Sequence, residues 1–287
     1  MNPDSSDIGI PRILWMMWLQ GRENAPEVVQ GCLPTWAKHN PGWKIVFLHQ
    51  HNLKEYLDVD EVIGRNREHI SIQALSNVIR INLLALYGGL WVDSTCFCCK
   101  PLDEWLGDYT RSGFFAFANP GRDRLLSSWF LASHPGCPLT TAWCREVNGY
   151  WTRNAFPFQD RQLGRLALRW TGKLLNHNSW LAALWVQPQF ARIFRLHPYH
   201  WFHYIFYRVV AADERCGQIW SRTPKITADG PHRLQQAGLL SPLSTGLKAI
   251  IDEQRDPLYK LNWRYRRKDW RPDSVLDYLM QSQAVTV

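Results

Sequence analysis

The sequence contains no apolar run that approaches the ~20 residues of a membrane-spanning helix. Internal repeats, low-complexity tracts and Gly/Ser-rich linkers are also missing. The first residues, Met1 to Asp7, are polar and acidic, unlike a signal peptide or a membrane anchor. Apolar residues make up 46% of the 287-residue chain and charged residues 20%, which argues against disorder. We therefore expect a cytoplasmic globular protein that at most attaches peripherally to the inner face of a membrane.

A disulfide framework is absent as well, because the seven cysteines form an odd set without regular spacing. Cys96, Cys98 and Cys99 lie close together in the sequence. Neighbouring thiols on an extended segment point to opposite faces, and no second Cys or Cys/His pair lies at a useful distance for a metal site. The pattern predicts buried, reduced thiols and a reducing compartment.

Positive charge is scarce in the first part of the chain and abundant in the second. Residues 1–160 hold 14 basic and 16 acidic residues, whereas residues 161–287 hold 19 and 9, which together make the net charge of +8. A basic face suits a polyanion or an anionic membrane surface, although a solvated face without a partner gives the same composition. A nucleic-acid-binding protein is a further reading of the basic cluster from Arg264 to Lys268. No nucleic-acid fold signature accompanies that cluster, so we expect no nucleic acid as partner.

Strands alternate with helices over the first ~120 residues, which predicts an α/β fold with a mainly parallel sheet. The apolar runs predict strands over residues 10–18, 43–48, 90–98 and 114–118, and the spacing predicts helices over 25–39, 52–70 and 71–87. Beyond residue 120 the pattern predicts helices over 125–151, 160–175, 199–211 and 274–280. We expect an α/β part at 1–120 and a mainly helical part at 121–287, packed as one compact unit.

The most informative segment runs from residue 74 to residue 103. Its helix is nearly all apolar except for one narrow polar strip, formed by Ser76, Asn77 and Arg80. Gly88-Gly89 allows the chain to reverse into a buried strand, which Asp93 follows directly. In open α/β sheets, ligands bind outside the carboxyl ends of the strands. Asp93 can hold a cation or ribose hydroxyls there with Ser94 and Thr95, and Arg80 can contact a phosphate or a sugar; a structural Arg80–Asp93 pair is the alternative.

This segment resembles the family of capsular polysaccharide synthesis proteins, which are related to the DXD-containing sugar transferases. The family carries a helix reading S-D-x-x-R, then L-x-x-x-G-G, a strand ending in an Asp-containing motif, and K-P-L-D. The matching residues are Ser76, Asn77, Arg80, Gly88, Gly89, Asp93, Lys100, Pro101, Leu102 and Asp103. The N-terminal region matches too, at Ile10, Pro11, Trp15, Trp18 to Gly21, Ala25, Pro26, Cys32, Trp36 and Asn40 to Trp43. Residues 199–206 and 257–263 resemble the family more thinly.

The resemblance implies a GT-A fold, in which a Rossmann-like nucleotide-sugar domain joins an extensive helical acceptor region. It also implies transfer of a sugar from a nucleotide donor, a UDP-sugar, to a capsular or other surface polysaccharide, with retention of the anomeric configuration. The partners would be the nucleotide sugar and a glycan or lipid-linked glycan acceptor. On this reading Asp93, Arg80 and Lys260 are the catalytic residues. The donor site would comprise Trp18, Gln20, Gly21, Ser76, Asn77, Arg80, Trp91, Asp93, Ser94 and Thr95.

Two departures from the family pattern bear on this reading. Thr95 stands where the second acid of the DXD motif is expected, and Asn77 replaces the usual Asp of the helix. Relatives use Mn²⁺ or Mg²⁺, for which Asp93 would be a ligand, but one carboxylate and a hydroxyl are a weak ligand set for a hard cation. Lys260 or Arg264 would then supply charge for the leaving diphosphate. A non-catalytic module that binds nucleotide or glycan is the competing hypothesis.

Candidates on the acceptor side are two histidines and an acid in the second half. His200 and His203 are spaced three apart on the helix predicted at 199–211, where they serve packing or acceptor contact. Asp213 follows that helix and is either an acceptor-side base or a solvated helix end. Most of the 16 tryptophans are expected in the core. Trp18, Trp91 and Trp263 are the ones we place near the donor.

Overall fold

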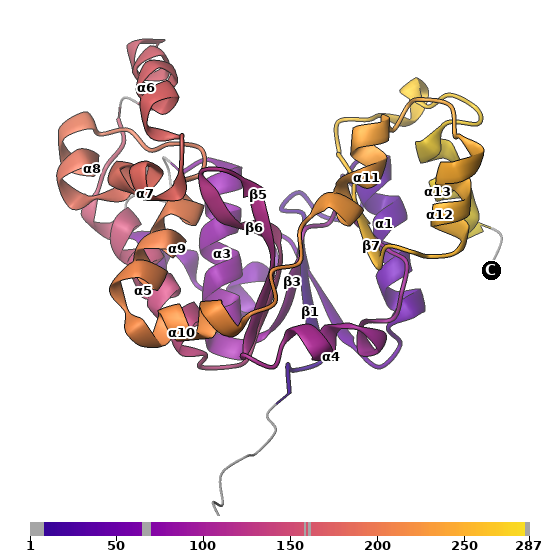
Figure 1. Cartoon of the computed structure of the whole chain (residues 1–287), viewed down its shortest axis with the longest axis horizontal. Helices are drawn as coiled ribbons and strands as arrows, with labels where there is room; N and C mark the ends of the chain where they lie inside the picture. The colour runs from indigo at the N-terminus through magenta and orange to yellow at the C-terminus, as the bar shows by residue number, and fades with distance from the viewer. Residues whose placement is uncertain (1–8, 65–69, 158, 160–161, 285–287) are drawn as a thin grey trace, which may run out of the picture. The chain divides into compact units, whose positions relative to one another are not determined.

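The computed structural model describes residues 9–64, 70–157, 159 and 162–284, and Figure 1 shows its ribbon. The polar N-terminus from Met1 to Asp7 lies outside the described residues. Hydrogen-bonded strands form a five-stranded sheet in the order β2-β1-β3-β6-β5, and β4 and β7 form a second, two-stranded sheet. The strands are β1 (Ile13–Met17), β2 (Lys44–Leu48), β3 (Gly89–Val92), β4 (Cys96–Cys98), β5 (Phe114–Gly121), β6 (Arg124–Ser133) and β7 (Leu258–Lys260). Together with the helices they confirm the predicted α/β class.

The described chain divides by its internal packing into two compact units, each assembled from separate segments. Unit 1 comprises the residues up to Pro11, His51–Trp91 and Tyr109–Ile226, and unit 2 comprises Arg12–Gln50, Val92–Asp108 and the residues from Thr227 onward. The predicted division at residue 120, between a donor part and an acceptor part, concerns function and stays a prediction. We describe each unit by itself.

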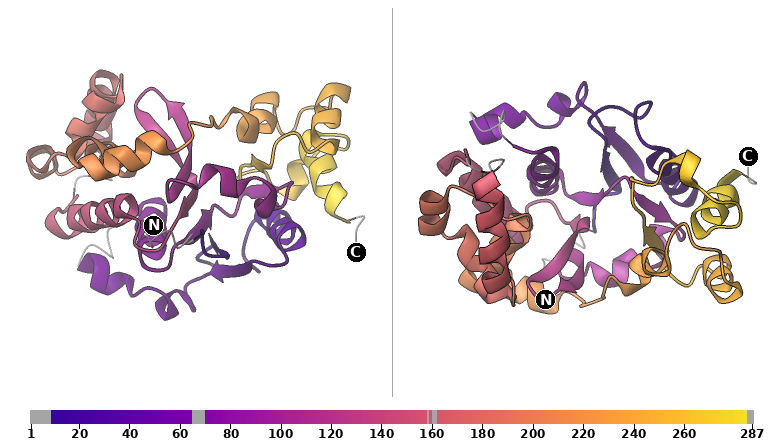
Figure 2. Two further views of the ribbon diagram at one scale, coloured as in Figure 1. Left: turned by 60° about the horizontal axis from the view of Figure 1, so that its bottom comes forward. Right: turned by 90° about the horizontal axis from the view of Figure 1, so that it is seen from above.

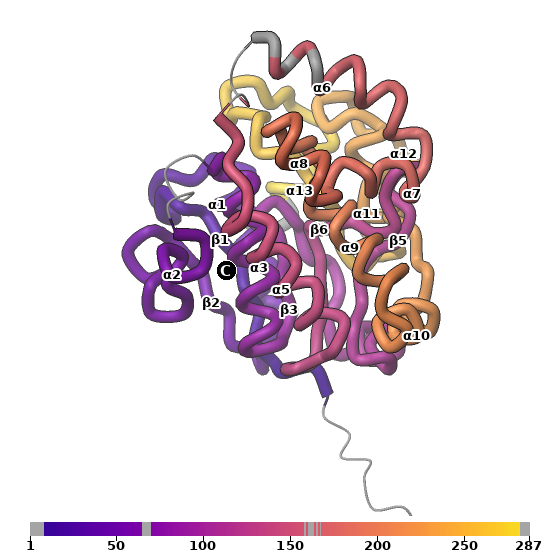
Figure 3. Tube along the Cα trace, turned by 90° about the vertical axis from the view of Figure 1, so that its left-hand side faces the viewer, coloured from indigo at the N-terminus to yellow at the C-terminus, as the bar shows by residue number. Residues whose placement is uncertain are grey.

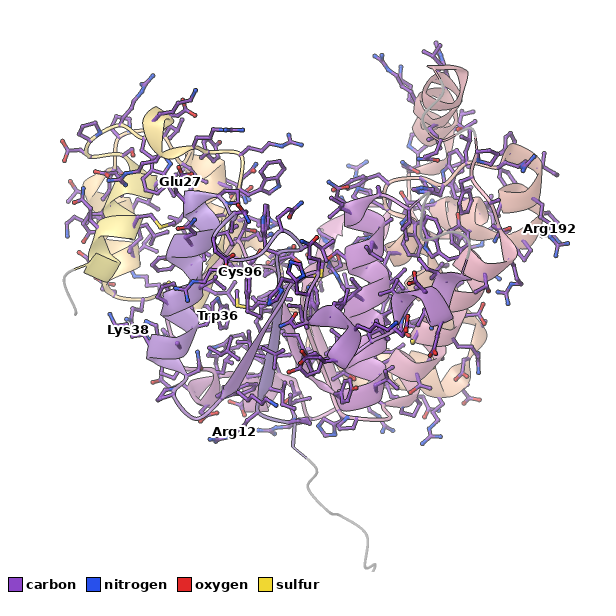
Figure 4. All side chains as sticks on the ribbon, turned by 180° about the vertical axis from the view of Figure 1, so that it is seen from behind. Arg12, Glu27, Trp36, Lys38, Cys96 and Arg192 are labelled. Carbon is purple, nitrogen blue, oxygen red and sulfur yellow. The ribbon has the colours of Figure 1, made fainter. Side chains whose placement is uncertain are left out.

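Unit 2 holds the parallel pair β1 and β2, the small sheet of β4 and β7, and the helices around them. These helices are α1 (Glu27–His39), η3 (Leu102–Glu104), α11 (Asp229–Ala237), α12 (Thr245–Asp252), η5 (Arg267–Asp269) and α13 (Val275–Ala284), while α4 (Leu106–Tyr109) lies at the boundary between the units. Helix α1 packs on β4 and α13, and α11 packs on β7, as both views of Figure 2 show on their right. Trp36 of α1 donates its indole N–H to the carbonyl of Cys96 in β4 at 2.7 Å, and the two residues are labelled in Figure 4.

Unit 1 combines β5 and β6 with most of the helices. Its helical segments are η1 (Leu53–Glu55), α2 (Val59–Ile63), α3 (Ile72–Tyr87), α5 (Pro138–Arg153), α6 (Gln162–Leu175), α7 (Ser179–Ala182), η4 (Ala183–Val186), α8 (Pro188–Phe194), α9 (Trp201–Ala212) and α10 (Glu214–Arg222). An aromatic core joins the sheet to these helices. Phe114 of β5 stacks on Phe206 of α9 at 6.0 Å between ring centroids, and Trp143 of α5 stacks on Phe202 at 4.1 Å.

Helix α3 has clear start and stop signals in its sequence. The Ser71 side chain accepts a hydrogen bond from the Ala74 N–H, which caps the first turn. The helix ends at Gly88, whose φ of 66° lies in the left-handed region that glycine adopts without strain. The predicted helix over residues 71–87 is therefore confirmed. Near the end of the helix, the Leu86 side chain is exposed.

The segment after residue 124 is the main error of the sequence prediction. The predicted helix over residues 125–151 is wrong for its first part, which forms strand β6. This strand pairs antiparallel with β5, with Phe114 opposite Ser133 and Ala116 opposite Leu131. An uninterrupted apolar run such as the one around Trp129 fits a buried strand and a buried helix equally well, so only the pairing partner decides. The helix begins at Pro138 instead.

The remaining general predictions concern thiols, tryptophans and membrane spans. All seven cysteines are buried and free, as predicted. Fully buried tryptophans include Trp15, Trp36, Trp143, Trp151 and Trp201, which confirms that many tryptophans lie in the core. Trp91, which we placed near the donor, is fully buried as well. Within the part of the chain that the structure describes, no helix is long and apolar enough to cross a membrane.

Candidate functional site

In unit 2, a short turn between β3 and β4 presents the predicted acid. The Cys96 N–H donates to the Asp93 carbonyl at 2.9 Å, so the chain turns back after Asp93. The extended strand predicted over residues 90–98 is therefore interrupted at Asp93, Ser94 and Thr95. Ser94 and Thr95 are buried, whereas the Asp93 side chain stays partly accessible. Strand β7 anchors the turn from the other side, because the Leu261 N–H donates to the Thr95 carbonyl at 2.8 Å.

The ammonium group of Lys260 lies against the side chains of Asp93 and Thr95. Strand β7 carries Lys260 opposite Cys96 in the antiparallel register. Its Nζ donates to Asp93 Oδ2 at 3.2 Å and also to Thr95 Oγ1. Residues 167 positions apart in the sequence thereby form one partly buried cluster. A positive charge thus stands beside the acid and the hydroxyl where a DXD motif would hold a metal ion.

The donor set of this cluster does not fit a divalent cation. Mn²⁺ and Mg²⁺ need several oxygen ligands, and here the carboxylate and the hydroxyl both accept hydrogen bonds from the Lys260 ammonium. A second cation next to that ammonium would be repelled. Among the described residues, no group of three or more His, Cys, Asp or Glu side chains is placed to hold a metal ion. We therefore derive no step through a metal.

A second group of predicted donor residues lies in the loop after β1. The Gly21 N–H donates to the Trp18 carbonyl at 3.0 Å, and the φ of Gly21 is 89°, so this turn favours glycine. The Gln20 carbonyl accepts a hydrogen bond from Asn24 at 2.9 Å. The Trp18 ring meets the edge of the exposed Trp263 ring at 6.1 Å between centroids.

An open groove of about 580 Å³ is lined in part by Trp263. Its lining joins the loop after Gly21 to the chain after β7, and comprises Glu23, Asn24, Ala25, Pro26, Glu27, Gln30, Trp263, Arg264 and Arg266. Aromatic faces beside guanidinium groups are suited to a planar base and to phosphate. Glu23 and Glu27, which also line the groove, are suited to hydroxyl groups of a sugar.

In unit 1, the predicted polar strip of α3 is built around a buried arginine. Arg80 donates to the Ser76 carbonyl at 3.2 Å, to Ser76 Oγ at 2.8 Å and to the Ser128 carbonyl of β6. Its guanidinium also lies 5.0 Å from the centre of the Trp91 ring. Asn77, the next residue of the strip, is half-buried. Within this unit the structure therefore brings Ser76, Arg80 and Trp91 together.

The two predicted acceptor-side histidines meet in a buried cluster. Their ring centroids are 5.4 Å apart, and no described residue forms a hydrogen bond with Nδ1 of either ring. His200 precedes α9 as its N-cap instead of lying within the helix. Burial is the main cause that lowers the pKa of His200 to about 4, and nearby Arg124 adds to it while Asp123 opposes it. Burial likewise lowers the pKa of His203 well below its ordinary value. Both imidazoles are therefore neutral at pH 7.

Sequence reasoning missed two members of this cluster, Asp123 and Tyr204. The Tyr204 hydroxyl donates to Asp123 Oδ2 at 2.7 Å, and Arg124 Nε donates to Oδ1 at 3.1 Å. Burial raises the Asp123 pKa, but these two donors outweigh it and the net pKa is lowered. The sequence signal was Asp123 followed by Arg124, just after Asn119-Pro120-Gly121. Such a stretch is also typical of a hairpin turn.

Asp213, the third predicted acceptor-side residue, caps helix α10. Its carboxylate accepts hydrogen bonds from the Cys216 N–H, which are the main cause that lowers its pKa. An acid with a lowered pKa is a weaker base. Asp213 also lines a cavity of about 300 Å³ in unit 1, together with Arg145, Glu146, Tyr150 and Arg208 among others.

The sequence of this chain matches a known protein family. The family model described as "Capsular polysaccharide synthesis protein" matches residues 2–159. The chain is 25% identical over 169 residues to the O-glycosyltransferase braB of Annulohypoxylon truncatum, a match that covers 52% of this chain and 39% of that protein. This chain thus spans less than half the length of that curated relative.

Among solved structures, the PaToxG Glycosyltransferase is similar with a TM-score of 0.40 and 13% identity, over 85% of this chain and 83% of that one. The residues matched by the family model include α3, the Gly88-Gly89 turn and Asp93. It extends over more than half of the sequence. The chain belongs to the family of capsular polysaccharide synthesis proteins.

Proposed function

We propose that this protein is a glycosyltransferase of the GT-A type that moves a sugar from a nucleotide donor, a UDP-sugar, to a capsular or other surface polysaccharide. Membership of the capsular polysaccharide synthesis family and similarity to a protein named as an O-glycosyltransferase support this proposal. In the reaction, the bond between the sugar C1 and the diphosphate oxygen breaks, and a bond from an acceptor hydroxyl oxygen to C1 forms. The nucleoside diphosphate leaves, and its oxygen takes up the proton of the acceptor hydroxyl. Retention of the anomeric configuration belongs to the same proposal.

The contact of Lys260 with Asp93 and Thr95 is the observation that carries this function. Negative charge develops on the diphosphate as the C1–O bond breaks, and a fixed cation stabilises that charge without reorganising. Asp93 and Thr95 hold the ammonium in place, and the accessible part of Asp93 would bind a ribose hydroxyl of the donor. We therefore propose that Lys260 supplies the charge that Mn²⁺ or Mg²⁺ supplies in DXD enzymes.

The other predicted donor residues take roles that suit their surroundings. Trp18, Gln20 and Gly21 would border the nucleotide, with Trp263 as an exposed ring next to Trp18. Asn77 and Arg80, with Ser76, would contact the donor sugar or its phosphates. On the acceptor side, His200 and His203 would contact a glycan or a lipid-linked glycan. The reaction would take place in the cytoplasm, on the inner side of the membrane.

The test is the release of nucleoside diphosphate by the purified chain from a panel of nucleotide sugars, with and without EDTA. Lys260→Met should lower this rate by about 10²-fold or more, the usual effect of removing one group that stabilises transition-state charge. Lys260→Arg should retain more activity, and the exposed Lys268→Met is the matched control with wild-type activity. EDTA should leave the wild-type rate unchanged. Loss of activity with EDTA, or full activity of Lys260→Met, would contradict the role given to Lys260.

A non-catalytic module is the second candidate, and the replacement of the second DXD acid by Thr95 favours it. Such a module binds a nucleotide or a glycan within a biosynthetic complex without turnover. Thermal-shift titration with UDP, next to the hydrolysis assay, separates the two candidates. Stabilisation by UDP together with no hydrolysis of any donor would replace the transferase by the module. Hydrolysis of one donor with an anomeric product read by NMR would establish the transferase and its stereochemistry.

A further inference from the structure

Helix α6 of unit 1 exposes several large apolar side chains to solvent. Helix α6 presents Leu166, Trp170 and Leu174, which are spaced by four residues and therefore lie along one side of the helix. Trp170 is 66% exposed and Leu174 71% exposed. Figure 3 shows α6 with the other helices of unit 1, and Figure 1 shows it standing clear of α8. Water therefore meets an apolar stripe that no other described side chain covers.

Apolar side chains are also exposed on the two helices that follow. Trp180 of α7 is 62% exposed, Ile193 of α8 is 73% exposed, and Tyr199 just beyond α8 is 77% exposed. We name residues 162–199, which include α6, α7, η4 and α8, the amphipathic lobe. Large apolar exposure of this kind marks an interaction surface. Tryptophan and tyrosine in particular are the residues enriched where an apolar phase meets water.

The charge of the amphipathic lobe is of one sign. Residues 162–199 contain five Arg and Lys and no Asp or Glu. Arg169 and Lys173 are exposed and precede Trp170 and Leu174 by one residue each, so their side chains border the apolar stripe. Lys173 Nζ lies 5.1 Å from the centre of the Trp170 ring. On α8, the exposed Arg192 is next to Ile193, and Figure 4 labels Arg192 on this helix.

We propose that the amphipathic lobe docks on an anionic membrane surface. The side chains of Trp170, Leu174 and Ile193 enter the interface, and the neighbouring arginine and lysine side chains contact lipid phosphates. An amphipathic helix with apolar side chains on one side and a basic border is the pattern of helices that lie in the plane of a membrane. This proposal goes beyond the sugar-transfer function, and it assigns a partner to a surface far along the chain from Asp93 and Lys260.

Charge complementarity favours the membrane over a second copy of the chain as the occupant. Two copies that meet through this surface would bring two acid-free basic segments together, which like-charge repulsion opposes. An anionic leaflet attracts the same charges, and each basic residue near such a surface adds to the attraction. A membrane also accepts exposed Trp and Leu side chains without a complementary groove.

The test is co-sedimentation of the full chain with vesicles of phosphatidylcholine alone and of an equimolar mixture of phosphatidylcholine and phosphatidylglycerol. We expect wild-type protein to sediment with the mixed vesicles and to bind much more weakly to phosphatidylcholine. Leu174→Glu should lower the partition coefficient by about tenfold or more, because a charge replaces an inserted apolar side chain. The matched control is Leu86→Glu, which changes an exposed leucine on α3 of the same unit and should bind like wild type.

A double variant, Arg169→Gln with Lys173→Gln, should weaken binding to the mixed vesicles and reduce its dependence on salt. Wild-type protein that stays in the supernatant, binds both vesicles equally, or binds as well with Leu174→Glu would overturn the proposal. A dimer in light scattering that Leu174→Glu dissociates, without vesicle binding, would assign the surface to a second copy instead. The hydrolysis assay with soluble donors is read separately, so failure of the transferase function and failure of membrane docking are distinguishable.

Discussion

The charged side chains of Arg80 and Lys260 have different surroundings. Arg80 and Lys260 are both cations held by nearby oxygen atoms, but they differ in what they contact. Arg80 donates to a serine side chain and to backbone carbonyls, which carry no net charge. Lys260 contacts the Asp93 carboxylate, whose side chain is still partly accessible. We therefore expect that changing Arg80 lowers the stability of the fold in addition to removing its proposed donor contact, whereas changing Lys260 affects catalysis.

Replacement of Arg80 by methionine should destabilise the protein. The half-buried Ser128 carbonyl of β6 would lose this donor, at a cost of about 1 kcal/mol or more. Urea denaturation of Arg80→Met measures this free energy of unfolding, with the exposed Arg169→Met as a control that should change it by less than about 0.5 kcal/mol. An unchanged free energy of unfolding with lost donor hydrolysis would show that Arg80 serves the donor and not the fold.

The stability of the protein should fall at mildly acidic pH because of His200. Its folded pKa is lowered to about 4, first by burial and then by Arg124, whereas the unfolded chain has the ordinary value of about 6.5. Protonation therefore favours the unfolded state, so the stabilisation is complete above pH ~6.5 and is lost as the pH falls toward ~4.

The non-titrating variant His200→Gln isolates this effect. Between pH ~6.5 and ~4 its free energy of unfolding should fall less than that of the wild type, by on the order of 2 kcal/mol. Urea denaturation at a series of pH values measures the difference, and carboxylates that titrate in both proteins cancel in it. Parallel pH profiles would show that His200 is not buried as a neutral imidazole. His203, whose pKa is lowered further, should keep its own contribution in this variant.

At the scale of elements, the reversal from α3 into β3 depends on Gly88. A Cβ atom on this residue would lie 2.7 Å from both the nitrogen and Cδ of Pro135, and the φ of 66° is unfavourable for any other L-residue. Gly88→Ala should therefore lower the free energy of unfolding by about 2 kcal/mol or more. Gly246→Ala is the control, since a Cβ on Gly246 in α12 meets nothing within 4 Å. Thermal or urea unfolding compares the two, and equal stabilities would refute the close approach to Pro135.

The elements also show where local pattern is sufficient. Helix α3 was predictable because Ser71, an apolar stripe and Gly88 all indicate the same bounds. Strand β6 was not, because the apolar residues around Trp129 carry no period that excludes a helix. The interruption at Asp93 depends on β7, whose Leu261 N–H binds the Thr95 carbonyl from a distant part of the sequence. A short segment of sequence does not show which distant strand it will pair with.

At the scale of the whole molecule, both units are assembled from separate stretches of chain. The sequence division at residue 120 predicts that residues 1–120 form a donor part, and this can be tested directly. In that fragment β5 lacks β6 and β4 lacks β7, so two sheets lose a pairing partner. We expect the fragment to be unfolded, because unpaired buried strands leave their backbone groups unsatisfied.

Circular dichroism and the dispersion of amide NMR signals measure the folding of this fragment. The full chain is the reference and should unfold cooperatively under the same conditions. Cooperative unfolding of the fragment alone would instead support the division at residue 120 as an independent domain. In that case β6 and β7 would be dispensable for the donor part, and Lys260 with them.

The sequence by itself determined the α/β class, the bounds of α3 and the buried thiols. These follow from local signals, because capping residues, glycine turns and apolar periods act within a few residues. Tertiary structure alone decided that β6 is a strand, that the Lys260 ammonium lies between Asp93 and Thr95, and that Trp170 and Leu174 remain exposed. These facts depend on which segments meet in space. Contacts between residues as far apart as Asp93 and Lys260 arise only when the folded chain brings their strands together.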